Sequence, residues 1–281
     1  MGGLAVAGIR VEYEEAGAGD RTAVVFVHGH PFDRTMWAPQ MAAGAGTGPR
    51  RKVAPDLRGY GRTTVVPGTT GFGTFARDVA AVLDALGLDR VVVCGLSMGG
   101  QIALEFRRLF ADRVAGLVLA DTFARPDTPR GREERYARAD RLEREGMAGY
   151  AHEVLDSMVS PANVRGMPEV AAHVRQMMVR TPPLGAAAAL RGRAERPDYT
   201  ELLGAIDVPV LVVVGREDVF TPVSDAEFMH ERLPDSRLAV IEGAGHMPNL
   251  ERPEAFNREL AALLAEVDAR EAARGAHPPR M

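Results

Sequence analysis

A serine flanked by glycines follows a short apolar run in the segment VVVCGLSMGG, residues 91–100. The centre of this segment, GLSMG, matches the pattern Gly-x-Ser-x-Gly, and the helix-like stretch QIALEF comes next. A serine at a tight turn from strand to helix has a strained backbone and an exposed hydroxyl, and its glycine neighbours leave room for that turn. We therefore predict that Ser97 is a nucleophile at the carboxyl edge of a sheet; the alternative is a serine that only caps the helix.

Two further side chains could activate this hydroxyl, because serine needs a general base and the base needs an orienting acid. His246 lies in the glycine-rich segment GAGHMPNLERPEAF, between a predicted strand and the last predicted helix. Asp218 lies in GREDVFTP, just beyond another predicted strand. The chain order Ser97, Asp218, His246 is one of the known orders of a catalytic triad. We expect these three residues to meet, with Glu217 or Asp121 as the alternative acid.

Two backbone N–H groups would stabilise the oxyanion that forms when a serine attacks a carbonyl. We expect one donor from Met98, the residue after the nucleophile, and the other from His30, in the loop HGHPFD that follows a predicted strand. His28 in the same loop, and Asp56 and Arg58 in the segment DLRGYGRT, are interpreted as residues that hold these loops together. The predicted site therefore combines three side chains with two main-chain donors.

The remaining sulfur and imidazole side chains do not form a competing site. Cys94 lies inside a predicted strand and is interpreted as a small buried hydrophobe. The histidines outside the predicted site have no spacing typical of a metal centre and are interpreted as surface or packing residues. They are His152, His173, His230 and His277. We expect neither a metal nor an organic cofactor.

Short valine-rich runs alternate with amphipathic segments along most of the chain, and these elements must position the site. Such alternation predicts an α/β fold, with a central, mostly parallel sheet and helices on its faces. The predicted strands span residues 9–16, 22–29, 51–56, 90–95, 115–121, 208–215 and 236–243. Apolar residues at helical spacing predict helices over 74–87 and 253–267, and the stretch 268–281 is expected to fray.

The alternation of strands and helices stops in the middle of the chain. We predict a helical cap over residues 122–206 and a core domain formed by 1–121 and 207–281. The cap begins with a stretch rich in arginine and acidic residues, 125–145, which is interpreted as a solvated helix face. The methionines of the cap could line a pliable apolar pocket or could pack against the core. They are Met147, Met158, Met167, Met177 and Met178.

Composition restricts the classes of protein to consider. The chain has 281 residues, 46% of them hydrophobic, which suits one large α/β domain with an insertion. The net charge is −4 and the 34 basic residues are interspersed with acidic ones, so no nucleic-acid or membrane partner is expected. A single cysteine, an N-terminus unlike a signal peptide and the lack of a membrane-spanning apolar run predict a cytoplasmic protein.

The segments HGHP, DLRGYGRT, GLSMGG, GREDVFTP and GAGHMPNLERPEAF together resemble the α/β-hydrolase superfamily, over about residues 9–267. Serine at position 97 differs from the aspartate of the dehalogenase and epoxide-hydrolase branches. Within the serine branch, the chain is similar to small bacterial esterases, enol-lactonases and cofactor-free haloperoxidases (perhydrolases). Pro31 after HGH is similar to the perhydrolase loop, whereas PPLGAAAALRGRAERPDYTELLGAI is similar to the enol-lactonases.

The resemblance implies a serine hydrolase that cleaves a carboxylic ester or lactone of a small molecule through an acyl-enzyme. One alternative uses the same triad for perhydrolysis or for cleavage of a carbon–carbon bond. An alternative of another class is a receptor-like protein that binds a ligand with little turnover. These alternatives differ in the acyl acceptor, the bond or the turnover, and none of the quoted segments distinguishes them.

Overall fold

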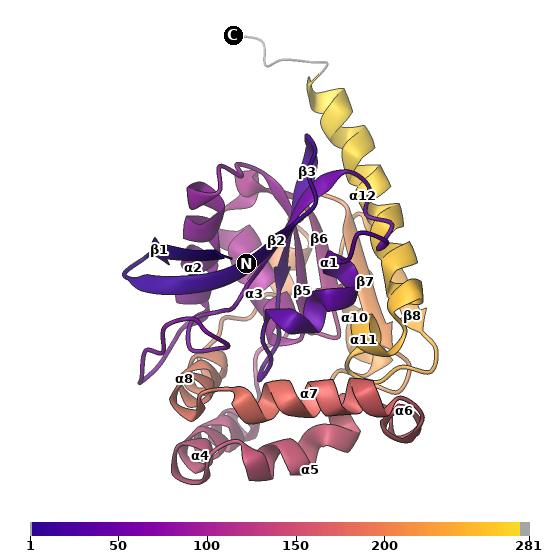
Figure 1. The fold of residues 1–281 in the computed structure, drawn as a ribbon. Coiled ribbons are helices and arrows are strands. Elements are labelled where there is room, and N and C mark those ends of the chain that lie inside the picture. Colours follow the sequence, from indigo (N-terminus) through magenta and orange to yellow (C-terminus); the bar gives the residue numbers. More distant parts are fainter. Residues whose placement is uncertain (1, 276–281) are drawn as a thin grey trace.

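The computed structural model describes residues 2–275, and its centre is an eight-stranded sheet (Figure 1). The strands are β1 (Gly2–Val6), β2 (Ile9–Ala16), β3 (Arg21–Val27), β4 (Arg50–Pro55), β5 (Val91–Leu96), β6 (Val114–Ala120), β7 (Val210–Gly215) and β8 (Ser236–Ile241). They lie in the order β1-β2-β4-β3-β5-β6-β7-β8. β2 pairs antiparallel with β1 and β4, and all other neighbours pair in parallel. The predicted α/β fold with a mostly parallel sheet is confirmed.

Strands β2 to β8 correspond to the runs that the sequence predicts, with small differences at their ends. β1 is not predicted, because its sequence GGLAV is short and begins with two glycines. Its conformation depends on pairing with β2 through a turn in which Ala7 and Gly8 both have positive φ. This edge strand is therefore determined by its partner rather than by its own residues.

Alternate residues of the central strands enter two hydrophobic cores, one on each face of the sheet. In β5, Val91 and Val93 pack on one face, while Val92 and Cys94 pack on the other. The first face is covered by α2 (Phe72–Ala85), α3 (Met98–Leu109) and α10 (Val223–His230). The second is covered by α12 (Pro253–Gly275) and by the short helices η1 (Arg34–Trp37), α1 (Ala38–Met41) and α11 (Pro248–Glu251). A short helix, η2 (Ala111–Arg113), leads into β6.

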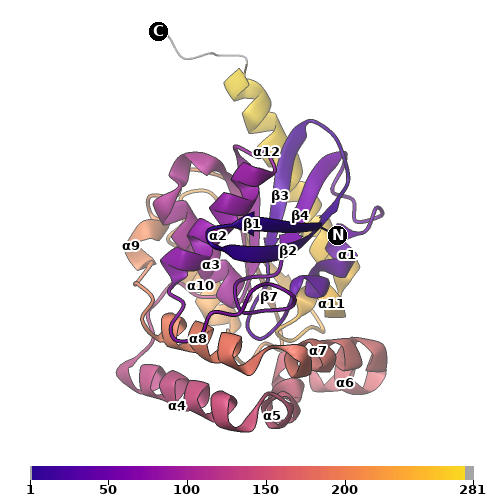
Figure 2. The ribbon, with the colours of Figure 1, turned by 60° about the vertical axis from the view of Figure 1, so that its left-hand side comes forward.

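Helices between β6 and β7 form a layer across the carboxyl end of the sheet (Figures 1 and 2). They are α4 (Pro129–Glu145), α5 (Ala148–Met158), α6 (Pro161–Gly166), α7 (Pro168–Arg180), α8 (Pro183–Ala194) and α9 (Thr200–Leu203). α9 differs from the others, because Tyr199, Leu203 and Ile206 around it pack in the same core as α2 and α3. The position of this layer is consistent with the predicted helical cap, except for α9. Within residues 2–275, no helix is both long enough and apolar enough to cross a membrane.

Helix α8 holds the cap close to the core, because two of its glycines press against core loops. A Cβ on Gly185 would overlap the backbone of Gly59, and a Cβ on Gly192 would overlap the carbonyl group of Thr70. The N–H of Thr70 also donates to the carbonyl oxygen of Ala188 at 3.0 Å. Only glycine permits such close contacts between backbones.

The predicted fraying of residues 268–281 is wrong for the part that the structure describes, because α12 continues to Gly275. Ion pairs compensate for the weak apolar stripe of this last stretch. Asp268 pairs with Arg50 at 2.8 Å and with Arg21 at 3.1 Å, and Arg270 pairs with Asp235. The other residues of that prediction, 276–281 with His277, lie outside the described part of the chain.

Candidate active site

Ser97 occupies the turn between β5 and α3, with φ of 56° and ψ of −116°. A positive φ is unfavourable for serine, so the surrounding structure must hold this conformation. Gly95 and Gly99 make it possible: a Cβ on Gly95 would overlap the carbonyl of Gly99, and a Cβ on Gly99 would overlap the carbonyl of Val27. The glycine pattern seen in the sequence is therefore a requirement of close backbone packing on both sides of the serine.

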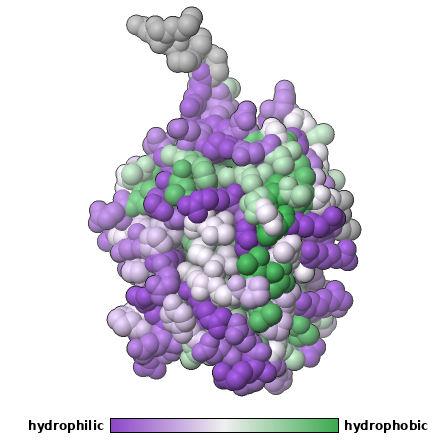
Figure 3. Space-filling view, turned by 90° about the vertical axis from the view of Figure 1, so that its left-hand side faces the viewer, coloured by the Kyte–Doolittle hydropathy of each residue, from purple (hydrophilic) through white to green (hydrophobic). Residues whose placement is uncertain are grey.

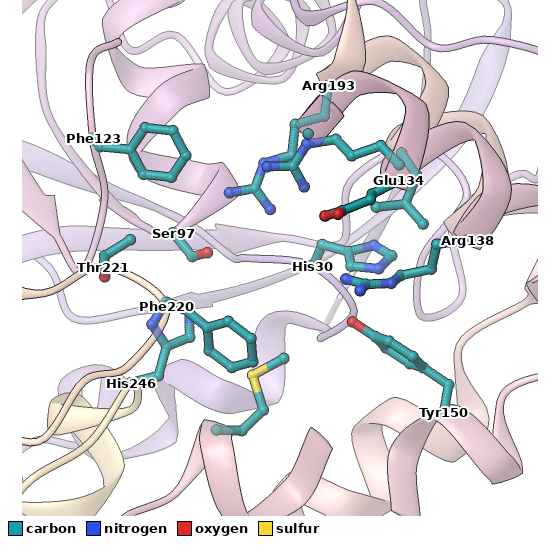
Figure 4. Close-up of a pocket in the computed structure, with 14 residues that line it drawn as sticks. His30, Ser97, Phe123, Glu134, Arg138, Tyr150, Arg193, Phe220, Thr221 and His246 are labelled. Atoms are coloured by element: carbon teal, nitrogen blue, oxygen red, sulfur yellow. The ribbon is translucent and has the colours of Figure 1, made fainter. Parts of the chain in front are cut away.

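Hydrogen bonds fix the main chain of this turn. The N–H of Ser97 donates to the carbonyl oxygen of Ala120 at 2.8 Å. The hydroxyl of Thr122 donates to the carbonyl oxygen of Ser97 at 2.7 Å, and so does the N–H of Gly100, at 3.0 Å. The side chain of Ser97 is not used as a helix cap. Its hydroxyl faces a cavity of about 190 Å³ at the junction of core and cap (Figure 4).

His246 and Asp218 come together from the loops that follow β8 and β7. The Nδ1 atom of His246 lies 2.7 Å from Oδ2 of Asp218, and both side chains are buried. His246 lines the same cavity as Ser97, and Figure 4 shows the two on the same side of it. With Nδ1 donating to the carboxylate, Nε2 of His246 is free to accept a proton. The structure thus brings the predicted acid and base into contact, next to the predicted nucleophile.

The carboxylate of Asp218 is stabilised in its charged form. It accepts hydrogen bonds from the N–H of Phe220 at 2.8 Å, from the N–H of Thr221 at 3.2 Å and from the Thr221 hydroxyl. Burial raises the pKa of Asp218, but His246 and these donors outweigh burial and hold that pKa below its usual value. Asp218 can therefore remain an anion beside an imidazolium.

Neither alternative acid contacts His246 in this way. Glu217 accepts a hydrogen bond from the hydroxyl of Ser160, on the cap side of the loop. Asp121 lies at the end of β6 with φ of 45°, and its Oδ1 accepts from the N–H of Gly215 at 2.9 Å. Burial and the nearby charge of Asp218 raise the pKa of Asp121 well above its usual value, so we expect this carboxyl group to be neutral.

Asp121, Asp218 and His246 are close enough to be considered as metal ligands, since one atom from each lies within 4.8 Å of the others. Their contacts fit a hydrogen-bonded group better. The 2.7 Å distance from His246 to Asp218 is a hydrogen bond, and a neutral Asp121 is a poor ligand. Neither aspartate lines the cavity through which an ion would enter.

The loop HGHPFD lies directly against the nucleophile. A Cβ on Gly29 would come within 3.2 Å of Cβ of Ser97. The N–H groups of His30 and Met98, the predicted oxyanion donors, donate to no other residue in the range 2–275. Both residues adjoin this contact in the chain, His30 directly after Gly29 and Met98 directly after Ser97. The placement is thus compatible with two donors converging on a substrate oxygen.

The residues interpreted as loop supports have this role in the structure. His28 accepts the N–H of Leu57 on Nε2 at 2.9 Å, while its Nδ1 lies 2.8 Å from the carbonyl oxygen of Gly29. Asp56 accepts from Arg34 and from the N–H of Arg62 at 3.0 Å. Arg58 forms a two-point ion pair with Asp78, with both distances 2.7 Å. These contacts join the two loops beside the cavity.

Within residues 2–275, the remaining cysteine, methionines of the cap and histidines lie away from the cavity except for Met158. Cys94 is buried within β5, and burial raises the pKa of its thiol well above the usual value. His152 is exposed, and His173 and His230 hydrogen-bond to Thr35 and Ser236. Of the five cap methionines, Met158 lines the cavity, whereas Met147, Met177 and Met178 belong to packed cores. The alternative of ordinary packing therefore describes most of these methionines.

The cavity wall also contains arginines that the sequence reasoning did not assign to the site (Figure 4). Gly131, Glu134, Arg135 and Arg138 of α4 line it, and Arg193 of α8 joins them. The interpretation of 125–145 as a solvated helix face agrees with the exposure of most residues of α4, and one side of this helix also borders the open cavity. The cap surface in Figure 3 is mostly hydrophilic. The four α4 residues that line the cavity follow the spacing i, i+3, i+4, i+7, which places them on one face of the helix. This spacing is the sequence signal that could have identified them as a group.

These arginines affect His30, which lines the same cavity. Its Nδ1 lies 2.8 Å from the hydroxyl of Tyr60. Burial, together with the charges of Arg193 and Arg135, lowers the pKa of His30 well below its usual value. His30 is therefore a neutral side chain in a positively charged wall, and it does not compete with His246 as a base.

Strand order, the strained serine turn and the helical cap place this protein among the α/β-hydrolases. Residues 24–259 match the model of the Alpha/beta hydrolase family, and the chain belongs to that family. The resemblance stated from the sequence segments is thereby confirmed.

Relatives with assigned names include lactonases and esterases. The chain is 32% identical to 3-oxoadipate enol-lactonase 1 of Acinetobacter baylyi, over 87% of this chain and 89% of the relative. A thermophilic esterase from Thermogutta terrifontis, solved with malate bound, is 40% identical, with a TM-score of 0.90 over 95% of this chain and 98% of that one. The enol-lactonase from Burkholderia xenovorans is 27% identical, with a TM-score of 0.87 over 94% and 100%.

Proposed function

We propose that this protein hydrolyses a carboxylic ester or lactone of a small molecule through an acyl-enzyme on Ser97. Two features at one cavity carry the proposal: a serine in a strained turn that lines the cavity, and a histidine paired with a buried carboxylate at 2.7 Å. Relatives named as enol-lactonases and esterases support the same reaction class.

In the proposed mechanism, the hydroxyl oxygen of Ser97 attacks the substrate carbonyl while Nε2 of His246 takes its proton. Asp218 holds the imidazole in the required tautomer and stabilises the imidazolium. The backbone N–H groups of His30 and Met98 stabilise the oxyanion. The imidazolium then returns the proton to the leaving alkoxide, which departs as an alcohol, or stays attached to the acyl chain if the substrate is a lactone.

Water completes the cycle by the same chemistry. His246 takes a proton from water, the resulting hydroxide adds to the acyl-enzyme, and collapse of the second tetrahedral intermediate releases the carboxylic acid and restores Ser97. None of these steps needs a metal or an organic cofactor. We also propose residues 122–206 as a cap unit over this site and the cytoplasm as its location, which the buried single Cys94 suits.

The test is the substitution Ser97→Ala, assayed on p-nitrophenyl esters of graded chain length and on a panel of lactones. We expect kcat/KM to fall by a factor of about 10⁴ to 10⁶, because the nucleophile and its base act as a unit. A fluorophosphonate probe should add its mass to Ser97 of the native protein and not to the variant. The matched control is Ser224→Ala, which changes an exposed serine of α10. Its kcat/KM and its labelling by the probe should equal those of the native protein.

Wild-type turnover by Ser97→Ala on every ester that the native protein cleaves would contradict the proposal. One equivalent of product followed by negligible turnover would favour the receptor-like alternative instead. Adding hydrogen peroxide to the ester assay and measuring peracid separates perhydrolysis from hydrolysis, because both begin with the same acyl-enzyme.

A further inference from the structure

The wall of the cavity carries more positive charge than a neutral ester requires. Three arginines line it, Arg135 and Arg138 from α4 and Arg193 from α8, against one carboxylate, Glu134. Figure 4 shows the guanidinium of Arg193 pointing into the cavity on the side of Ser97 and Phe123, and Arg138 pointing into it beside His30. Arg193 is buried, so little water screens its charge, whereas Arg138 and Glu134 are exposed to solvent at the rim of the cavity.

Arg193 is the most unusual of the three. It is only 8% exposed, and it forms no ion pair with any carboxylate in the range 2–275. Its Nε donates to the side-chain oxygen of Gln101 at 2.9 Å, and its guanidinium carbon lies 5.9 Å from the ring centre of Phe123. Burial, Arg135 and Arg196 together lower the pKa of Arg193 well below its usual value. A buried cation without an anion destabilises the fold, so a bound anion would be favourable there.

Asp127, the carboxylate whose charge acts on Arg193, is already bound to other cations. It forms a two-point pair with Arg135 at 2.6 and 2.9 Å and a further contact with Arg196 at 2.7 Å. One carboxylate therefore faces two guanidinium groups, which leaves no charge to balance Arg193. The positive charge of this wall is not neutralised by the protein itself.

Arg138 is the second unpaired guanidinium of the cavity. It has no ion pair within the described residues, and its guanidinium carbon lies 5.7 Å from the ring centre of Tyr150. Glu134, one turn earlier on α4, is exposed and pairs with Arg130 at 2.8 Å. The acidic residue of the wall thus has its own partner and does not neutralise Arg138.

We propose that this cavity selects esters or lactones that carry a carboxylate, and that Arg193 and Arg138 bind this carboxylate while the carbonyl lies at Ser97. The inference rests on the proposed function and specifies its substrate class. Guanidinium groups suit this role, because their N–H donors match the two oxygens of a carboxylate.

The rest of the wall limits the substrate to a short chain. Phe123, Phe220, Met158 and Leu190 supply apolar surface near the same serine, and the cavity volume is about 190 Å³. An apolar wall beside a cationic wall suits a short hydrocarbon spacer between an ester and a carboxylate. Half-esters of small dicarboxylic acids have this form.

The experiment compares monoethyl glutarate with ethyl pentanoate, which have the same acyl chain length and differ in the terminal carboxylate. Hydrolysis is followed by acid release in a pH-stat. We expect kcat/KM of the native protein to be at least about tenfold higher for the half-ester, because a charge-assisted hydrogen bond contributes about that much.

The variants are Arg193→Gln and Arg138→Gln, and each should reduce the preference for the half-ester about tenfold or more. Arg191→Gln is the matched control: Arg191 lies two residues from Arg193 on α8, pairs with Asp140 and Glu143 on the outside, and does not line the cavity. It should keep the native preference. A melting temperature measured for each variant shows that the fold is intact.

A second measurement does not depend on catalysis. Glutarate should raise the melting temperature of the native protein and of Ser97→Ala, and should raise that of Arg193→Gln and Arg138→Gln much less. If both esters are cleaved with equal kcat/KM, or if all variants keep the same preference, the carboxylate site is wrong while the hydrolase proposal stands. If neither ester is cleaved and Ser97 is not labelled, the hydrolase proposal fails, and the glutarate shifts alone decide whether the anion site exists.

Discussion

Asp218 and Asp121 are two buried carboxyl groups a few ångströms apart whose surroundings favour opposite charge states. Asp218 accepts three hydrogen bonds besides the one from His246, and its pKa lies below the usual value. Asp121 has one backbone donor and faces the charge of Asp218, and its pKa lies well above the usual value. Two like charges this close are unfavourable in a buried site, which contributes to the raised pKa of Asp121.

This difference predicts that the same substitution, aspartate to asparagine, has effects of very different size on kcat at the two positions. Asp218→Asn should lower kcat by a factor of about 10⁴, because the histidine loses its tautomer and the imidazolium its counter-charge. Asp121→Asn replaces a neutral acid by a neutral amide and should cost much less, about tenfold at most. The measurement is kcat of both variants at neutral pH; an equal loss in the two would mean that Asp121 is ionised.

The raised pKa of Asp121 also predicts a dependence of stability on pH. Above about pH 4, Asp121 ionises in the unfolded chain while the fold retains its proton, so rising pH favours the unfolded chain. Between about pH 4 and the raised pKa of Asp121 in the fold, the free energy of unfolding of the native protein should fall with rising pH. The expected fall relative to Asp121→Asn is up to about 1.4 kcal/mol per pH unit. Melting temperatures of both proteins from pH 4 to pH 8 measure this, and a difference that does not change with pH would exclude it.

At the scale of elements, the turn between β5 and α3 depends on backbone contact. Gly95 and Gly99 permit the strand, the loop after β3 and the start of α3 to approach without side chains between them. The strain at Ser97 is maintained by hydrogen bonds to Ala120, the last residue of the neighbouring strand β6, and to Thr122 just after it. The geometry of the nucleophile therefore depends on sheet pairing as well as on its local sequence.

Gly95→Ala tests this dependence. Its Cβ would overlap the carbonyl of Gly99, so α3 must move, and we expect a loss of about 1 to 3 kcal/mol of stability together with a large drop in kcat. Gly149→Ala, a helical glycine of α5 with no atom within 4 Å of its added Cβ, is the control. The free energy of unfolding in urea and kcat are measured for both variants. Equal values in the two would show that the turn between β5 and α3 tolerates displacement.

At the scale of the whole molecule, the site exists only where the cap meets the core. Ser97, His246 and His30 come from core loops, whereas Arg138, Arg193 and the apolar wall come largely from α4, α5 and α8. α8 is fixed against the core at Gly185 and Gly192. If the proposed function holds, substitutions in the core loops and in the cap should therefore affect turnover and substrate binding separately.

Gly192→Ala should displace α8 from the loop at Thr70 and disturb the cap without touching the triad. We expect a lower melting temperature and a higher KM, with fluorophosphonate labelling of Ser97 retained, because the serine turn lies in the core. Gly166→Ala in α6, where the added Cβ meets no atom within 4 Å, is the cap control. Unchanged KM in Gly192→Ala would argue against substrate contacts from α8.

Local sequence determined the central strands, the serine turn and the positions of Asp218 and His246. Strand periodicity and close backbone packing leave a direct pattern in the residue types, namely valine runs and glycines at fixed spacing. Asp218 and His246 form a hydrogen bond, and His246 lines the same cavity as Ser97, while the triad and the oxyanion hole stay predictions. The edge strand β1 and the last turns of α12 left no such pattern, because they depend on pairing with β2 and on ion pairs with distant residues.

Only the tertiary structure decided which charges face the cavity. Arginine is common on solvated helices, so Arg135 and Arg138 could not be distinguished by type from the exposed arginines of α4. Arg193 becomes a buried, unpaired cation because α8 lies between α4 and the core and because Asp127 already binds Arg135 and Arg196. Burial and the loss of counter-charges are properties of contacts between segments far apart in the chain, and no local pattern encodes them.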